Sequence, residues 1–203
     1  MKPILLLLAA PLLLAGGCSL RTSPTSSLEE SRPERAVALN PDNAHAHFQL
    51  GRIALDEGRT GEAAGHFRRA RTIQPTFEEA WNGEGIAFLD AREYGRAATH
   101  FAAMAEALPS SVPAVEGRAA AALGLRRLDE AKTFATDAVN RDAKSAQGYR
   151  ILGEVAYING DYALAAENWK RALELNPSLG SVIRPTLEDL NGYIGKYGAK
   201  PKS

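Results

Sequence analysis

The chain has 203 residues, of which 45% are hydrophobic, with 24 basic and 24 acidic side chains and a single cysteine. A chain of this length can bury a substantial core. Its balance of charge argues against nucleic acid as the main ligand, because binding to phosphates needs an excess of positive surface. The lone cysteine has no partner for a disulfide within the chain.

Residues 1–17 are typical of an export signal. Lys2 gives a short positive end, an apolar run follows over residues 4–14, and small residues precede Cys18. The apolar run is too short to be a stable membrane anchor. The stretch resembles a bacterial lipoprotein signal, which implies that Cys18 is lipidated and becomes the new N-terminus. By the same resemblance, Ser19 implies the outer membrane. An ordinary signal peptide cut at the same place is the alternative.

Two short segments follow the predicted signal. Residues 18–32 are polar and rich in Ser, Thr and Pro, which is typical of a flexible linker. Residues 33–43 look like the end of a repeat whose first helix is missing. We expect this half-repeat to cap the N-terminal side of the array that comes next.

Two series of residues recur every 34 residues through most of the remaining chain. One series holds only small residues, and the other holds an aromatic residue in three of its four places. They are Gly51, Gly85, Ala119 and Gly153, and Phe67, Phe101, Ala135 and Trp169. A fixed step of this length, with small residues where helices must touch closely, indicates a helix–turn–helix solenoid. Such arrays typically bind other proteins.

Four units carry this pattern, at residues 44–77, 78–111, 112–145 and 146–179. They resemble the tetratricopeptide repeat, in which small residues let two helices approach closely and an aromatic side chain fills the space beside them. The resemblance implies an all-α, right-handed superhelical solenoid with capping helices at its ends. Gly58 and Gly160, near the ends of first helices, suit a left-handed C-cap.

The third unit departs most from the pattern. It has Val115 and Ala135 in the two bulky places and Ala143 where the other units have Pro. We expect it to be the least well packed, because lost side-chain volume destabilises a core. At a place that is normally apolar, the second unit has Glu84 and the third has Arg118. These two side chains either form a partly buried ion pair or reach solvent at the helix edges.

Residues 180–195 predict a last helix that closes the array. Ile183, Leu187, Leu190 and Ile194 fall on one face. Because proline is tolerated only in the first turn, Pro185 places the start of this helix near Arg184. Residues 196–203 carry three lysines and are expected to be disordered. This tail either stays solvated or makes weak contacts with anionic lipid or a partner.

The resemblance places certain residues of each first helix on the concave side of the array. They are Phe48, Arg52, Leu55, Asn82, Ile86, Leu89, Glu116, Ala120, Leu123, Arg150, Glu154 and Tyr157. An apolar stripe runs among them, flanked by Arg52 and Arg150, and suits an amphipathic helix or an extended peptide of a partner. Alternatively, the stripe supports helix packing, or a terminal segment of the chain covers it.

Catalysis and metal binding have little support. His45 and His47 diverge on a helix and do not share a metal. His66 and His100 are expected on the convex surface, one repeat apart. The sequence has no HExxH, GxSxG or P-loop pattern. We therefore predict no enzyme activity, no metal and no cofactor.

The combined features resemble the small tetratricopeptide lipoproteins of Flp/Tad and type IV pilus systems, which help a secretin ring reach or assemble in the outer membrane. The resemblance implies a lipid-anchored scaffold that faces the periplasm and binds a segment of a secretin or of another pilus or secretion component. An adaptor for cell-wall or envelope enzymes is the alternative. The sequence does not name the partner or distinguish a helical from an extended ligand.

Overall fold

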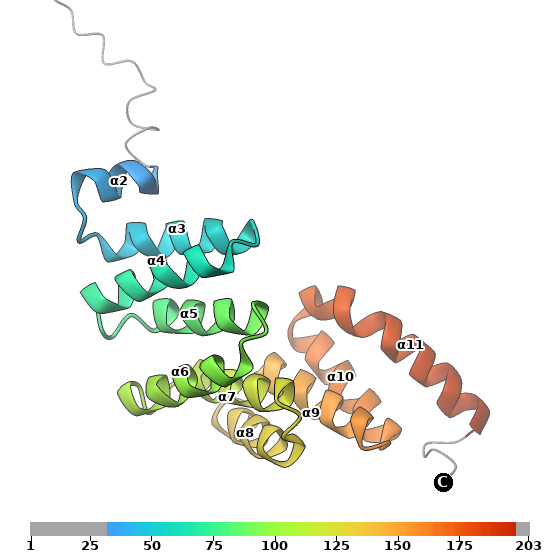
Figure 1. The fold of residues 1–203 in the computed structure, drawn as a ribbon. Helices are drawn as coiled ribbons and strands as arrows, with labels where there is room; N and C mark the ends of the chain where they lie inside the picture. Colours follow the sequence, from blue (N-terminus) through green and yellow to red (C-terminus); the bar gives the residue numbers. More distant parts are fainter. Residues whose placement is uncertain (1–31, 198–203) are drawn as a thin grey trace, which may run out of the picture.

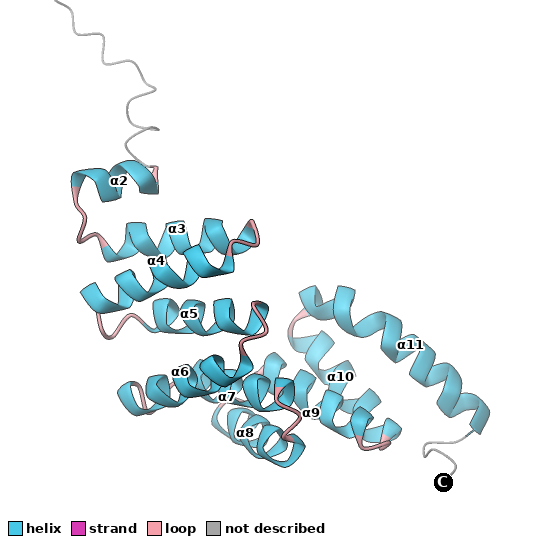
Figure 2. Ribbon diagram, in the orientation of Figure 1, coloured by secondary structure: helices cyan, strands magenta, loops and turns pink. Residues whose placement is uncertain are grey.

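The computed structural model describes residues 32–197, which form a solenoid of helical hairpins (Figure 1). All the regular elements over these residues are helices (Figure 2). The predicted all-α solenoid is thereby confirmed. The predicted signal, Cys18, nearly all of the linker and residues 198–203 lie outside the described residues. Within residues 32–197, no helix combines the length and the apolar character that crossing a bilayer requires.

Four hairpins of nearly equal length follow one another along the solenoid. Their helices are α3 (Ala44–Asp56) and α4 (Thr60–Ile73), α5 (Glu78–Asp90) and α6 (Tyr94–Ala107), α7 (Val112–Gly124) and α8 (Leu128–Arg141), and α9 (Ala146–Ile158) and α10 (Tyr162–Leu175). The short helix α2 (Pro33–Leu39) packs on α3. At the other end, the turn η1 (Pro177–Leu179) leads into α11 (Gly180–Tyr197), which packs on α10.

Small residues bring the two helices of a hairpin together against a buried ring. A Cβ atom added at Gly85 would lie 2.2 Å from the ring of Phe101, and one added at Gly153 would lie 2.3 Å from the ring of Trp169. Both rings are buried. Only glycine allows the backbone to approach the ring this closely, as the repeat pattern predicts.

Each hairpin turn contains one residue in the left-handed conformation. Gly58 has φ 74° and Gly160 has φ 77°, which confirms the predicted C-caps. The equivalent turns of the second and third hairpins hold Arg92 at φ 58° and Arg126 at φ 62°. A residue with a Cβ atom costs about 1–2 kcal/mol in this conformation. The common hairpin geometry therefore overrides the local preference of these two arginines.

The third hairpin is closed by small residues and by its neighbour. Ala119, Ala131 and Ala135 are fully buried in one cluster with Ile151 and Val155 of α9. The third hairpin thus shares its core with two aliphatic side chains of α9. The lower stability of this hairpin stays a prediction.

The last helix begins at residue 180, as the predicted range 180–195 does, and not near Arg184. α11 starts at Gly180 and contains Pro185 beyond its first turn, so a start near Arg184 is wrong. Its apolar face, including Ile183 and Leu187, is buried in one cluster with Trp169 of α10. This packing outweighs the single backbone hydrogen bond that a proline removes. The helix also continues to Tyr197, two residues beyond the predicted end.

Candidate partner-binding groove

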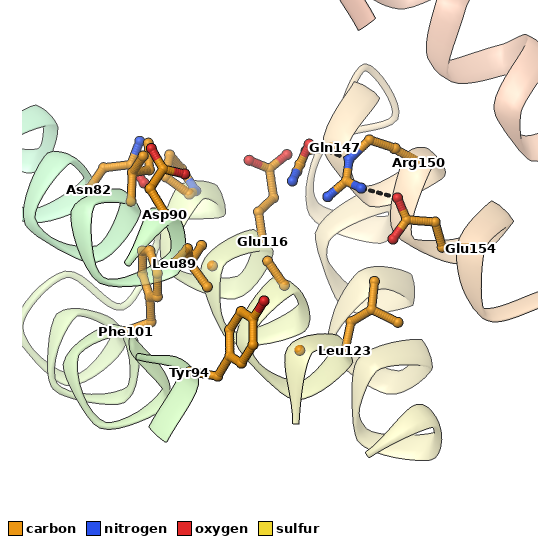
Figure 3. A pocket seen from close by; sticks show the side chains of 15 residues that line it. Asn82, Leu89, Asp90, Tyr94, Phe101, Glu116, Leu123, Gln147, Arg150 and Glu154 are labelled. Atoms are coloured by element: carbon orange, nitrogen blue, oxygen red, sulfur yellow. Dashed lines mark hydrogen bonds and ion pairs between the residues drawn. The ribbon is translucent and has the colours of Figure 1, made fainter. Parts of the chain in front are cut away.

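A cavity of about 670 Å³ opens where the first helices of the second, third and fourth hairpins face one another (Figure 3). These helices are α5, α7 and α9. Eight of the residues that the sequence predicts on the concave side line it: Asn82, Ile86, Leu89, Glu116, Ala120, Leu123, Arg150 and Glu154. The periodic spacing of these residues brings them together, because equivalent positions of stacked repeats lie side by side.

The predicted residues of the first hairpin do not line this cavity. Phe48 packs between other rings, with centroid distances of 5.7 Å to Phe67 and 5.1 Å to Phe77. Leu55 packs against the core. Arg52 is exposed and donates a hydrogen bond to Gln49 of its own helix at 3.5 Å. The cavity is therefore built by the last three hairpins.

A second pocket of about 320 Å³ continues the cavity toward α11. Leu123 and Glu154 line both spaces, and Tyr157, Trp169 and Val182 line the second one. Tyr157 is 41% exposed and Val182 is 64% exposed, which leaves apolar surface available in this pocket. The terminal helix thus forms a wall beside Tyr157 without filling the space. We call the cavity and this pocket together the groove.

Glu116 occupies the middle of the groove, between the residues of α5 and those of α9 (Figure 3). Its hydrogen-bond partner is Ser145, the N-cap of α9, whose Oγ accepts the Gly148 N–H at 2.9 Å and whose hydroxyl donates to Glu116 Oε1 at 2.6 Å. Burial raises the pKa of Glu116, and the charge of Asp142 acts in the same direction. The hydrogen bond from Ser145 opposes these effects without cancelling them.

Asp90 is a second carboxylate in the groove with little compensation. It is the last residue of α5, where the helix dipole offers a negative charge no stabilisation. Burial raises its pKa. Neither Asp90 nor Glu116 forms an ion pair with any of the described residues.

Among residues 32–197, the one cation that lines the larger cavity is already paired. Arg150 donates a hydrogen bond from Nη1 to Glu154, four residues along α9, and another from Nε to Gln147 Oε1 at 3.0 Å (Figure 3). Of the described side chains, three acids and one base thus line the cavity. Neither arginine that was expected to flank the apolar stripe therefore offers an unpaired positive charge in the cavity. Arg52 lies elsewhere, and Arg150 is neutralised by Glu154.

Both expectations for Glu84 and Arg118 are wrong. Glu84 is 1% exposed, so it does not reach solvent, and it accepts hydrogen bonds from Arg68 Nε at 2.8 Å and Arg71 Nε at 2.6 Å. Arg118 instead lies over the ring of Phe134, 4.0 Å from its centroid. The partners of Glu84 come from α4 because the second helix of the first hairpin packs directly on α5.

The expected convex position of His100 is also wrong. His100 is buried, its Nε2–H donates to the carbonyl oxygen of Trp81 at 2.8 Å, and its Nδ1 lies 3.8 Å from Glu84. His66 is partly buried, with its Nδ1 atom 3.2 Å from Nδ1 of His47. Burial lowers the pKa of both His66 and His100. Among residues 32–197, no three or more His, Cys, Asp or Glu side chains are grouped as a metal site.

Comparisons with known proteins identify the repeats. Family models described as tetratricopeptide repeat match residues 34–76 and 146–179. The first and fourth hairpins, which these segments include, are thus similar to the tetratricopeptide repeat. It is 28% identical over 166 residues to the human tetratricopeptide repeat protein 13, a match that covers 78% of this chain and 19% of that protein. The chain therefore spans about a fifth of the length of this curated relative.

Solved structures share the fold at low sequence identity. A thermophilic tetratricopeptide protein from Thermus thermophilus has a TM-score of 0.66 and 21% identity, over 76% of this chain and 84% of that one. PilF from Pseudomonas aeruginosa has a TM-score of 0.61 and 16% identity, over 85% of each chain. Likeness at this level shows the fold alone. Tetratricopeptide domains bind peptide or protein partners and are typically not enzymes.

The sequence analysis missed several groove residues. Asp90 directly follows Leu89, and Gln147 lies three residues before Arg150, so reading a wider stripe on each first helix finds them. Val182 and Ile183 of α11 carry no such signal. Their place depends on how the last helix docks, which the repeat pattern does not encode.

Proposed function

We propose that this chain is a lipid-anchored scaffold that binds a protein partner in the groove and assists the assembly or outer-membrane targeting of a pilus or secretion complex. The observation that carries the binding role is the open cavity formed by α5, α7 and α9, which has the size of spaces that hold ligand side chains. Tetratricopeptide repeats bind peptide or protein partners, which supports this role.

The N-terminal sequence supports the anchored part of the proposal. Cys18, outside the described residues, is the proposed lipid attachment site, and each buried methylene of an acyl chain contributes about 0.8 kcal/mol to anchoring. Residues 18–32, nearly all outside the described residues, would act as the linker predicted from the sequence, with a reach on the order of 20 Å for a random coil of this length. A groove held on such a linker stays close to the outer membrane, where a secretin assembles.

The pilus or secretion role rests on the resemblance to tetratricopeptide lipoproteins of such systems. Deleting the protein from its host is expected to lower the amount of secretin in the outer membrane, measured by fractionation and immunoblotting. The full chain should restore it. Cys18→Ala, which removes the lipid site, and Leu123→Glu, which places a charge in the groove, should restore it poorly. Unchanged secretin yield and location after the deletion contradict the proposed role.

Cross-linking distinguishes this role from that of an adaptor for cell-wall enzymes. A photoreactive residue at Leu89 or Tyr157 places the reporter in the groove. Capture of a secretin or another component of a pilus or secretion complex supports the proposal. Capture of a peptidoglycan hydrolase or synthase at both positions replaces it with the adaptor role. A photoreactive residue at the exposed Glu106 of α6 is the control outside the groove.

A further inference from the structure

We infer that the groove selects a partner segment in which a lysine or arginine lies close to a large apolar side chain. This inference rests on the part of the proposed function that assigns the groove to a protein partner. It assigns a defined charge to the amphipathic helix or extended peptide that the sequence predicts as the ligand. The basic residue would lie against Asp90 and Glu116, and the apolar side chain would enter the pocket beside α11.

Charge is the first reason. Among the described residues, the larger cavity is lined by Asp90, Glu116 and Glu154, with Arg150 as the only base, and Arg150 is paired with Glu154. Two carboxylates remain without a cation from this part of the chain. Glu116 is half-buried and Asp90 is exposed, so an arriving ammonium or guanidinium group would stabilise chiefly the carboxylate of Glu116, which is partly withdrawn from water. Burial, which raises the pKa of both groups in the free protein, supports this assignment.

Glu84 shows how the fold compensates a carboxylate that is fully buried. Glu84, buried between the first two hairpins, receives hydrogen bonds from two arginines. Asp90 and Glu116 have no such arrangement within residues 32–197. A cation supplied by a partner would therefore complete, at Glu116, the kind of pairing that Glu84 already has within the chain.

The surroundings of the carboxylates suit a long basic side chain. Leu89 and Leu123 line the same cavity and can pack against the methylenes of lysine or arginine. Asn82 and Gln147 lie on either side of Glu116 and add amide oxygens as further acceptors (Figure 3). The cavity therefore offers acceptors for the charged end and apolar contacts for the stem of one side chain.

The adjoining pocket determines where the apolar part lies. It shares Leu123 and Glu154 with the larger cavity, so one bound segment can occupy both. Tyr157, Trp169 and Val182 provide its apolar walls. Arg126, the one cation among the described residues that line it, is exposed in the turn after α7 and disfavours a basic residue at this end. One end of the groove thus favours a basic residue of the bound segment, and the other end favours an apolar residue.

Synthetic peptides test this assignment on the full chain. Four fluorescein-labelled peptides of equal length would carry Lys with Leu, Gln with Leu, Glu with Leu, or Lys with Ser at fixed positions in an otherwise neutral sequence. Fluorescence anisotropy gives each Kd at low salt. We expect the Lys–Leu peptide to bind about tenfold more tightly than the Gln–Leu or Lys–Ser peptide, and the Glu–Leu peptide to bind most weakly.

Variants connect the preference to the named carboxylates. The double variant D90N/E116Q should bind the Lys–Leu and Gln–Leu peptides equally, while the control E106Q, with one exposed acid of α6 neutralised, keeps the preference. Circular dichroism checks that both variants fold. Should the double variant unfold, the wild-type protein still decides the matter: the advantage of lysine over glutamine must shrink as salt increases. Equal binding of the four peptides, or a preference for the acidic one, overturns the inference.

Other occupants give distinct results. If the chain's own basic tail fills the groove, removing residues 198–203 will tighten binding of the Lys–Leu peptide and refute the need for a foreign partner. If a second copy of the chain fills the groove, sedimentation will show a dimer that the Lys–Leu peptide dissociates. This result would also refute the need for a foreign partner. A preference for Lys–Leu with no change in secretin location after deletion would remove the pilus role and leave this inference intact.

Discussion

Glu84 and Glu116 lie on the first helices of neighbouring hairpins, but Glu84 is buried, Glu116 is half-buried, and their surroundings differ. Glu84 accepts hydrogen bonds from Arg68 and Arg71 and lies near a buried histidine. Glu116 has one neutral partner, the hydroxyl of Ser145, and faces an open cavity. A carboxylate neutralised inside the fold joins two repeats together. One that is left without a cation remains available to a ligand.

The two sites should therefore respond in opposite ways to the loss of charge. At Glu84 the carboxylate and its arginines depend on one another, because a buried charge without its partner is strongly destabilising. At Glu116 the charge has no cationic partner among the described residues, and burial disfavours its ionised form. Stability measurements on matched variants test whether the two sites respond in this way.

The largest effect is expected from removing both cations of Glu84. The double variant R68A/R71A leaves a buried carboxylate without its partners and should lower the free energy of unfolding by about 3–5 kcal/mol. Urea unfolding followed by circular dichroism measures it. Adding Glu84→Leu to the double variant should recover much of the loss. A loss below about 1 kcal/mol would mean that the two arginines contribute little.

The next effect is a loss of stability on mild acidification. Burial lowers the pKa of His66 and His100 in the folded chain, so their unfolded forms bind protons first as the pH falls below about 6.5. The melting temperature should then fall between pH 7 and 5.5. His100→Gln, which keeps a donor for the Trp81 carbonyl, should flatten part of this dependence. An unchanged slope in that variant contradicts a role for His100.

A smaller effect is expected at Arg118, which contacts the ring of Phe134 and not Glu84. Arg118→Ala should cost about 0.5–1 kcal/mol, the value of an exposed cation–π contact. Combining it with Phe134→Leu in a double-mutant cycle should show that the two losses are not additive. Coupling between Arg118 and Glu84 in the same kind of cycle would instead restore the pair expected from the sequence.

The smallest effect, and the one of opposite sign, is expected at Glu116. Glu116→Gln removes the buried charge and keeps an acceptor for the Ser145 hydroxyl, so the melting temperature should rise by about 1–2 °C at pH 7. The same substitution at Glu84 should lower it. Differential scanning calorimetry of the two variants side by side checks the contrast. A decrease in both would show that the two carboxylates have the same structural role.

The linear order of residues determined the local structure of this protein. The recurrent small and aromatic residues predict the helical hairpins, and glycine at residues 58 and 160 predicts two of the left-handed turns. The resemblance to the tetratricopeptide repeat selects eight residues that line the cavity. These features follow from the sequence because each depends on contacts within a hairpin or between equivalent positions of adjacent hairpins.

The pairing of buried charges and the docking of the terminal helix depend on tertiary packing and could not be read from the sequence. The partners of Glu84 come from α4, 13 and 16 residues away, because of how α4 packs on α5. Pro185 lies inside α11 because burial of Ile183 and Leu187 compensates the lost hydrogen bond. Docking of α11 also turns Val182 into a wall of the groove. Such contacts join non-equivalent positions, so the repeat spacing predicts none of them.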